Sequence, residues 1–276
     1  MPKKEKPGVA SKPDLLERFV PILLVVSVAL AFLVGMLWQK VAYLEKGGAN
    51  VAGAQVQQQA VQPVKSASLD QIKDLFNQDV VKFGSADSKL LLVEVADPSC
   101  PYCHVAAGLN PELNKQVDPA RYTLVSEGGT FVAPVPEIKK LVDQGKASFV
   151  WIYSPGHGNG EMGTKAMYCA YEKGKFWEVH DVLMTSKGYD FLNDTIQNDK
   201  TKSGELSDFL ASAFDSSQMK TCLDSGKYDS RIQNDTNLAG SIGVNGTPGF
   251  YVNDKFYGGA FSFKDMEATV NSALGS

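Results

Sequence analysis

The sequence contains few residues of the types that bind metals. Four cysteines and three histidines occur in 276 residues, and only Cys100 and Cys103 are closely spaced cysteines. A structural zinc site needs two further ligands near such a pair. Cys169, Cys222 and the histidines provide no second close pair. The sequence therefore predicts no metal site and no bound cofactor.

Basic residues are scarce after residue 65. Residues 66–276 contain 19 Lys and Arg against 27 Asp and Glu, a net charge of −8, whereas residues 1–65 carry +4. Binding to nucleic acid requires a basic face that neutralises phosphates. We therefore expect no nucleic-acid partner. No internal repeat is visible either, so nothing suggests a repeat architecture.

Charged residues are absent from Phe19–Trp38, a run of twenty predominantly apolar residues. A helix of this length matches the roughly 30 Å hydrocarbon core of a bilayer. Five basic residues precede the run and only Lys40 and Lys46 closely follow it, which places the N-terminus in the cytoplasm. The prediction is a cytoplasmic tail (1–18), a single transmembrane anchor (19–43), a Gly-, Ala- and Gln-rich linker (44–66) and an extracytoplasmic domain (67–276).

A cleaved signal peptide is the alternative for the same run. Its apolar region should span about 7–15 residues and end beside a small-residue cleavage site. Here the run is longer and ends in the bulky residues Met36-Leu37-Trp38. These features favour an uncleaved anchor that holds the domain at the cytoplasmic membrane.

The remainder of the chain alternates strand and helix patterns. LLLVEVA (90–96) and SFVWIY (148–153) are short apolar runs typical of buried strands. Residues 157–240 are predicted as a block of short helices. Strand patterns at 250–252 and 255–257 flank Asn253-Asp254 as a hairpin, and a capping box at 262–265 begins a last helix. This order indicates an α/β fold with helices packed on a sheet.

Cys100-Pro101-Tyr102-Cys103 lies where the first strand runs into a helix. At a helix N-terminus, unpaired N–H groups and the helix dipole stabilise a thiolate. A second cysteine three positions later can resolve a mixed disulfide. We therefore predict Cys100 as the nucleophile and Cys103 as the resolving thiol of a redox-active dithiol.

Cys169 and Cys222 fall in predicted helices of the helical block. They could form a second redox pair, a structural disulfide or two buried thiols. An oxidising compartment promotes structural disulfides, so we favour that alternative. Closing a loop of this size would stabilise the fold by about 4 kcal/mol.

Several segments resemble the DsbA-like branch of the thioredoxin superfamily, which comprises extracytoplasmic thiol–disulfide oxidoreductases of bacteria. They are LLLVEVADPSCPYCH, GVNGTPGFYVND, PEIKKLVDQGKASFVWIYSP, CAYEKGKFWEVHDVLM and CLDSGKY. The resemblance covers about residues 90–105 and 136–274. It implies a thioredoxin-like fold with an inserted helical subdomain at about 157–240.

The resemblance also implies roles for individual residues. Thr247-Pro248 would form a cis peptide opposite the dithiol, and the Thr247 backbone would pair with an extended substrate. Pro101 and Tyr102 would contact the same substrate. Glu94, in an apolar strand, would be a buried acid with a raised pKa that accepts a proton from Cys103. The alternatives are an ordinary loop proline at 248 and a strand-edge charge at 94.

Residues 106–135 depart from the family pattern. Gly108, Asn110-Pro111 and Asp118-Pro119 predict a shortened or broken helix followed by an inserted strand or loop. The histidines carry no chemistry in this interpretation. His104 is expected to face solvent, whereas His157 and His180 are expected to be surface or packing residues.

Three functions are compatible with these features. The first is a thiol–disulfide oxidoreductase that introduces disulfides into reduced or unfolded exported proteins. By resemblance, a quinone-linked membrane oxidoreductase would recycle it. The second is a reductase for a dedicated extracytoplasmic client. The third is a non-enzymatic, membrane-tethered chaperone or binding module. The Pro-Tyr pair between the cysteines does not fix the redox direction.

Overall fold

A five-stranded mixed sheet runs through residues 66–275, the part of the chain that the computed structural model describes. The strand order is β1-β3-β2-β4-β5. β2 and β3 are parallel, and the other neighbours are antiparallel. The strands are β1 Val81–Phe83, β2 Leu91–Ala96, β3 Ser148–Tyr153, β4 Gly249–Val252 and β5 Lys255–Gly258.

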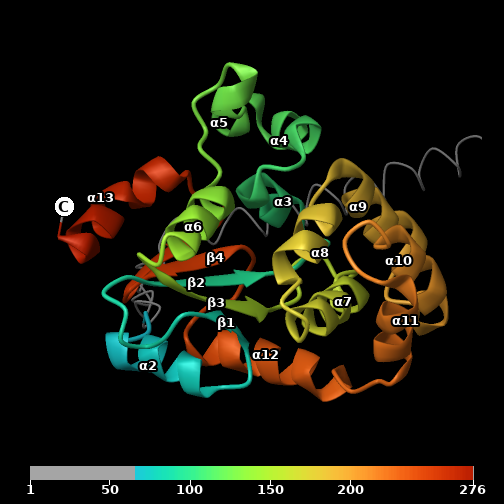
Figure 1. Cartoon of the computed structure of the whole chain (residues 1–276). Coiled ribbons are helices and arrows are strands. Elements are labelled where there is room, and N and C mark those ends of the chain that lie inside the picture. Colours follow the sequence, from blue (N-terminus) through green and yellow to red (C-terminus); the bar gives the residue numbers. More distant parts are fainter. Residues whose placement is uncertain (1–65, 276) are drawn as a thin grey trace, which may run out of the picture. The chain divides into compact units, whose positions relative to one another are not determined.

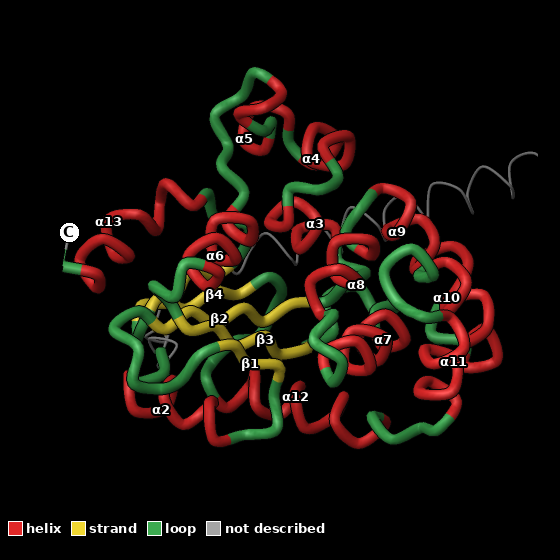
Figure 2. Tube along the Cα trace, viewed as in Figure 1, coloured by secondary structure: helices red, strands yellow, loops and turns green. Residues whose placement is uncertain are grey.

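Helices surround this sheet (Figures 1 and 2). The α-helices are α2 Leu69–Asp74, α3 Pro101–Ala107, α4 Pro111–Val117, α5 Pro119–Tyr122, α6 Pro134–Asp143, α7 Glu161–Tyr171, α8 Phe176–Leu183, α9 Ser186–Asp190, α10 Ser203–Phe209, α11 Ser216–Asp224, α12 Asp229–Ser241 and α13 Phe263–Leu274. Short 3₁₀ turns cover Leu75–Asn77, Val125–Glu127 and Lys200–Lys202, and a π-helical turn covers Phe191–Ile196.

The two parallel strands are central because every residue in them is buried. Their near-continuous apolar composition suits a strand that is covered on both faces. In β2, the side chains of Leu92, Glu94 and Ala96 share one face of the sheet, and Leu91 and Val93 share the other.

Each face of the sheet has its own hydrophobic core. One core joins Leu92 and Trp151 to residues of α3, α6, α7, α8 and α13. The second joins Val93 and Val150 to residues of α2 and α12. In Figure 1, α2 and α12 lie below the sheet, and α3 and α6 lie above it. The α3 face is where Glu94 and the cysteine motif meet.

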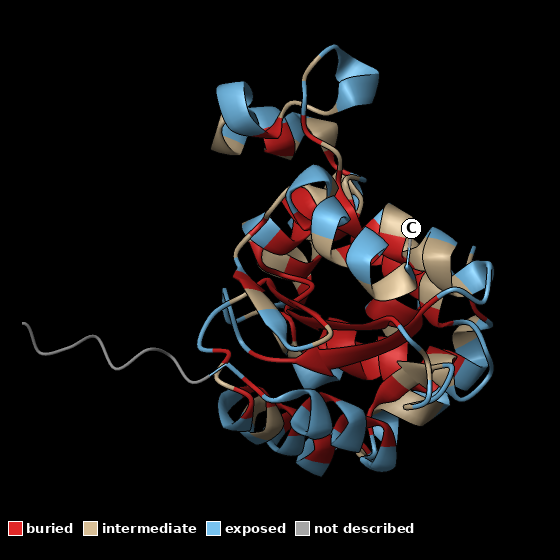
Figure 3. Cartoon of the chain, turned by 90° about the vertical axis from the view of Figure 1, so that its left-hand side faces the viewer, coloured by how far each residue is buried: buried red, intermediate tan, exposed pale blue. Residues whose placement is uncertain are grey.

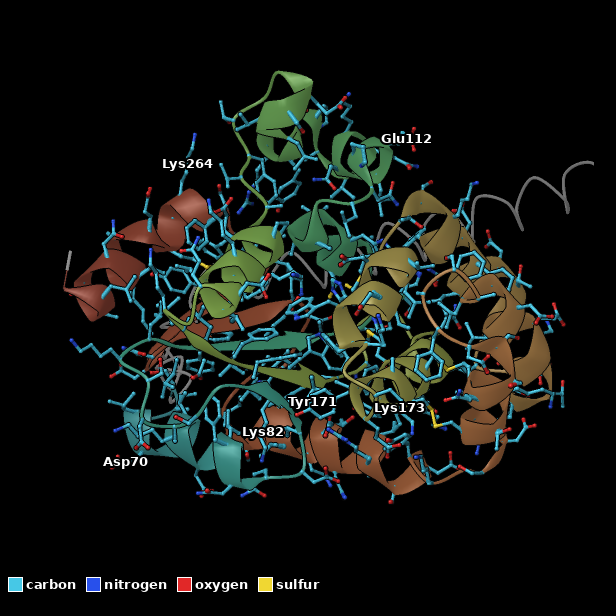
Figure 4. All side chains as sticks on the ribbon, in the orientation of Figure 1. Asp70, Lys82, Glu112, Tyr171, Lys173 and Lys264 are labelled. Atoms are coloured by element: carbon cyan, nitrogen blue, oxygen red, sulfur yellow. A yellow bond between two sulfur atoms is a disulfide. The ribbon has the colours of Figure 1, made fainter. Side chains whose placement is uncertain are left out.

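β1 is a strand that the sequence pattern did not indicate. It has only three residues and pairs with β3 in antiparallel register. The Tyr171 hydroxyl donates to the Lys82 carbonyl at 2.8 Å and accepts from the Lys82 backbone N–H at 3.2 Å. Figure 4 labels both residues near β1. β1 is therefore defined by tertiary contacts and not by its local sequence.

The stretch from residue 106 to residue 135 is a broken helix followed by a loop, as predicted. α3 ends at Gly108, whose positive φ of 68° suits glycine. Asn110 and Asp118 then cap the short helices α4 and α5. The helices α4 and α5 project away from the sheet, and most of their residues are exposed or half-buried (Figure 3).

The predicted α/β architecture with an inserted helical block is confirmed. After β3, the chain forms helices α7 to α12 before it returns to the sheet through β4. The predicted tail, anchor and nearly all of the linker lie outside the described residues. Within residues 66–275, no helix combines the length and apolar character needed to cross a bilayer.

Candidate active site

Cys100 is the N-cap of α3, directly after the turn that ends β2. Its backbone N–H donates to the Asp97 carbonyl at 3.0 Å, and its own carbonyl accepts from the Cys103 N–H at 3.0 Å. Pro101 occupies the first helical turn, where the missing N–H costs little. The strand-to-helix junction predicted from the sequence therefore places Cys100 at the helix N-terminus.

The two cysteines are free thiols of unequal character. Cys100 is 3% exposed and Cys103 is completely buried. A hydrogen bond from the Cys103 thiol is the main factor that lowers the pKa of Cys100 to about 7, and burial acts against it. Burial raises the pKa of Cys103 well above its usual range. Near neutral pH the first thiol is therefore substantially ionised and the second is not.

Thr247-Pro248 forms the wall opposite the dithiol, and its peptide bond is cis. The Cys100 Sγ lies 3.5 Å from the Thr247 carbonyl oxygen. The Thr247 side chain further lowers the Cys100 pKa. A pocket of about 350 Å³ lies beside the cis peptide and includes Phe256 in its lining. Residues separated by 147 positions in the sequence thus meet at one sulfur atom.

Glu94 lies within the sheet on the α3 face and is completely buried. In the described part of the chain, neither of its carboxyl oxygens has a hydrogen-bond partner. Burial raises its pKa to about 8, so the group is mostly protonated at neutral pH. In its ionised form Glu94 also contributes to the raised pKa of Cys103. The two groups are therefore electrostatically coupled.

The prediction that His104 faces solvent is wrong, because the side chain is completely buried. Its Nδ1 lies 2.9 Å from the Met184 carbonyl, and its Nε2 lies 2.9 Å from the Pro98 carbonyl. Burial lowers its pKa to about 4, whereas the two carbonyl contacts act in the opposite direction. Met184 caps the end of α8, where carbonyls lack helical partners. His104 thus links the active-site turn to the helical block.

The other two histidines lie as expected. His157 is exposed in the loop after β3, and His180 is buried in α8 against Phe176 and Trp177. Within residues 66–275, no cluster of three or more His, Cys, Asp or Glu residues could hold a metal ion.

Tyr102, between the two cysteines, is 45% exposed. Its ring meets Tyr122 edge-on at 6.2 Å, and Tyr122 in turn meets Phe131 at 5.3 Å. The excursion that departs from the family pattern therefore contacts the cysteine motif itself.

Cys169 and Cys222 form a disulfide between α7 and α11 across a sequence separation of 53 residues. Their Cα atoms are 6.1 Å apart. The bond borders a surface pocket of about 410 Å³ that also includes Phe214. It joins two helices of the helical block.

Sequence reasoning missed Asp97 and Ser99, which are both completely buried beside the dithiol. The Asp97 backbone N–H donates to the Cys103 Sγ at 3.4 Å. The only signal in the sequence is an acid placed directly between a buried strand and the cysteine motif. Its partners lie about sixty residues further along the chain, so the pattern alone could not reveal them.

Comparison with known proteins places this chain in a family. A family model described as thioredoxin matches residues 133–272, just over half of the chain. In a crystal structure of alpha-DsbA1 from Wolbachia pipientis, 19% of residues are identical. That comparison gives a TM-score of 0.52 and covers 71% of this chain and 92% of that one.

Two curated relatives have low overall identity. The Na(+)/H(+) antiporter NhaA 3 of Salinispora tropica is 28% identical over 70% of this chain, and the match covers 24% of the antiporter. The chain thus spans about a quarter of that relative. Disulfide bond formation protein D of Bacillus subtilis is 25% identical over 69% of this chain and 75% of that protein. On the strength of the family model, which is consistent with the fold, this chain belongs to the thioredoxin family.

Proposed function

We propose that this chain is a thiol–disulfide oxidoreductase that exchanges the Cys100–Cys103 disulfide with thiols of exported proteins. The observation that carries the proposal is the asymmetry of the dithiol. Cys100, with a pKa of about 7, lies against the cis Thr247-Pro248 peptide, and Cys103 is fully buried with a raised pKa. An ionisable outer sulfur and a protonated inner sulfur are suited to attack and resolution.

The exchange proceeds in two steps. A substrate thiolate attacks the Cys100 sulfur of the oxidised protein, and Cys103 leaves as a thiolate that takes a proton from Glu94. A second substrate thiolate then attacks the substrate sulfur of the mixed disulfide, and Cys100 leaves as a thiolate. The substrate gains a disulfide and the protein gains a dithiol. In the reverse direction, Glu94 accepts the proton of Cys103.

The substrate is proposed to bind as an extended segment. The Thr247 backbone lies beside the Cys100 Sγ and would pair with the segment, which would also contact Pro101 and the exposed ring of Tyr102. Since backbone pairing recognises main-chain groups, reduced or unfolded proteins of many sequences could bind.

The cellular setting is also a proposal. The charge-free run at residues 19–38 and the basic residues before it support a single-pass anchor with the catalytic domain outside the cytoplasmic membrane. A quinone-linked membrane oxidoreductase would reoxidise the dithiol. Cys169–Cys222 would act as a structural disulfide.

A dedicated reductase is the second candidate, and one observation favours it. A Cys100 pKa of about 7 equals that of thioredoxin, whereas the oxidant DsbA has a pKa of about 3.5. A more stable thiolate makes the reduced form more stable and the protein a stronger oxidant.

The reduction potential separates these candidates. A potential near about −120 mV supports disulfide formation, whereas one near about −270 mV supports reduction. The variant Cys100→Ala addresses the non-enzymatic alternative. If that variant still oxidised or reduced an unfolded protein substrate, the dithiol would not be the reactive group.

A further inference from the structure

The Asp97 carboxylate is completely buried beside the dithiol and accepts five hydrogen bonds. Its Oδ1 accepts from the backbone N–H and from the hydroxyl of Ser99, both at 2.7 Å. Its Oδ2 accepts from the backbone N–H groups of Gly156, His157 and Gly158, at 2.7, 3.0 and 3.5 Å. Three successive N–H groups around one carboxylate oxygen form an anion-binding concavity. Charge-assisted bonds of this kind are stronger than neutral ones.

These bonds fix the loop of residues 156–160, hereafter the 156–160 loop, next to Cys100. A Cβ atom added to Gly156 would lie 1.8 Å from the Thr247 Oγ1 and 3.2 Å from the Cys100 Cβ. A Cβ atom added to Gly160 would lie 1.8 Å from the Asp97 Oδ1. The loop backbone therefore fills the space beside the reactive residue, and glycine is required for this close approach.

The backbone of Asp97 contacts both cysteines as well. Its N–H donates to the Cys103 Sγ at 3.4 Å, and its carbonyl accepts from the Cys100 N–H at 3.0 Å. A second connection runs through Ser99, whose hydroxyl accepts from the Asn159 N–H at 3.2 Å. The 156–160 loop and the dithiol are thus held in one hydrogen-bonded unit.

We propose that Asp97 is a positioning residue that holds the 156–160 loop against Cys100 and Thr247, so that the loop limits the size of groups that reach the Cys100 sulfur. The loop forms one wall of the site, and the cis peptide forms the other. This leaves Cys100 only 3% exposed. This selectivity rests on the proposed function. A substrate cysteine in a narrow, extended segment can reach the Cys100 sulfur, whereas a cysteine embedded in a folded surface cannot.

The carboxylate is necessary because both of its oxygens accept. An asparagine has one acceptor oxygen and one NH₂ donor. In Asp97→Asn, the NH₂ group would face either the N–H groups of the 156–160 loop or the donors of Ser99. Buried donors without acceptors are costly, so the loop would separate from the active-site turn.

The test uses the reduced full-length chain and two alkylating reagents. Iodoacetamide is the small probe, and a maleimide that carries a polyethylene glycol chain is the bulky one. The Cys100 rates are measured by mass spectrometry of the modified peptide, well above the Cys100 pKa, so that the thiolate fraction is the same in every variant. The result is the ratio of the bulky-reagent rate to the small-reagent rate.

In Asp97→Asn we expect this ratio to rise by about tenfold, as the loop opens locally and exposes the sulfur. In Ser99→Ala the ratio should stay closer to that of the wild type, because the bonds from Oδ2 to the loop remain. Gly240→Ala is the matched control, since an added Cβ there meets no atom within 4 Å. Its ratio should equal that of the wild type.

An unchanged ratio in folded Asp97→Asn would overturn the inference. If this variant does not fold, Gly156→Ala takes its place, because its Cβ would crowd both Thr247 and Cys100. We expect the loop to shift away from them and the ratio to rise. A wild-type ratio in folded Gly156→Ala would overturn the inference equally. Alkylation requires no protein substrate and no redox partner. A failure of the proposed function would therefore appear in the exchange assays and not in this ratio.

Discussion

Tyr102 and Tyr122 meet edge to face with their ring centroids 6.2 Å apart. The first lies between the two cysteines, and the second ends the helix α5 in the excursion at residues 106–135. Tyr122 is 5% exposed and also contacts Phe131, so its position is fixed. The excursion therefore supports the exposed ring that borders the reactive sulfur.

Tyr122→Ala should slow exchange with an unfolded protein substrate and leave the iodoacetamide reactivity of Cys100 unchanged. We expect about a fivefold fall in rate, since an aromatic pair contributes about 1 kcal/mol. The measurement is oxidative refolding of a reduced protein. Lys115→Ala is the control, because Lys115 is an exposed residue of the same excursion. Equal rates for Tyr122→Ala and the wild type would show that the excursion does not contribute.

Cys103→Ala should raise the pKa of Cys100 from about 7 toward its ordinary value of 9.0. The thiol of Cys103 makes the largest contribution to the lowered pKa, and alanine cannot donate a hydrogen bond. Cys103→Ser keeps a hydroxyl donor and should raise the pKa less. The ultraviolet absorbance of the thiolate during a pH titration measures both. An equal rise in the two variants would show that a hydrogen-bond donor at position 103 does not lower the Cys100 pKa.

Glu94→Gln should change how stability depends on pH. Folded Glu94 keeps its proton up to about pH 8, whereas the unfolded carboxyl ionises near its ordinary value of 4.5. Between these values unfolding releases a proton, so the stability of the wild type falls as pH rises. Glutamine does not titrate and removes this contribution.

The free energy of unfolding of Glu94→Gln, relative to the wild type, should therefore increase by about 2 kcal/mol from pH 5 to pH 7. Urea unfolding at the two pH values measures it. Parallel pH profiles for the two proteins would mean that Glu94 is ionised in the folded state at pH 5.

Replacing Cys169 and Cys222 together by alanine should lower stability by about 4 kcal/mol, as expected for a disulfide that closes a loop of this length. The reduction potential of the Cys100–Cys103 pair should stay the same, because the Cys169–Cys222 disulfide lies within the helical block. Thermal unfolding and a glutathione titration measure the two quantities. A shifted potential in the folded double variant would give this second cysteine pair a redox role.

The strands β2 and β3 and the hairpin β4–β5 could be predicted because short apolar runs end at residues that break strands, such as Asp97-Pro98. β1 could not, since its three residues form a strand only against β3. The burial of His104 could not be predicted for a similar reason. Its burial depends on carbonyls from the end of α8 and from the turn at Pro98. Such partners are visible only after the helices have packed.

In the candidate site, too, some residues can be predicted from local sequence and others depend on distant partners. Cys100 and Cys103 are identified by local spacing. Asp97 is not, because the N–H groups that bind its carboxylate belong to residues 156–158. Backbone N–H groups are present in nearly every residue type. The sequence pattern therefore cannot predict which of them bind a carboxylate.

The central position of β2 has a consequence for synthesis of the protein. β2 leads into the dithiol and pairs with β3 and β4, and β4 follows about 150 residues later in the chain. During the proposed export, Cys100 and Cys103 therefore reach the oxidising side before the strand and cis peptide that enclose them. Four cysteines allow three pairings, so under the proposed export the new chain would pass through an interval in which Cys100 could bond to Cys169.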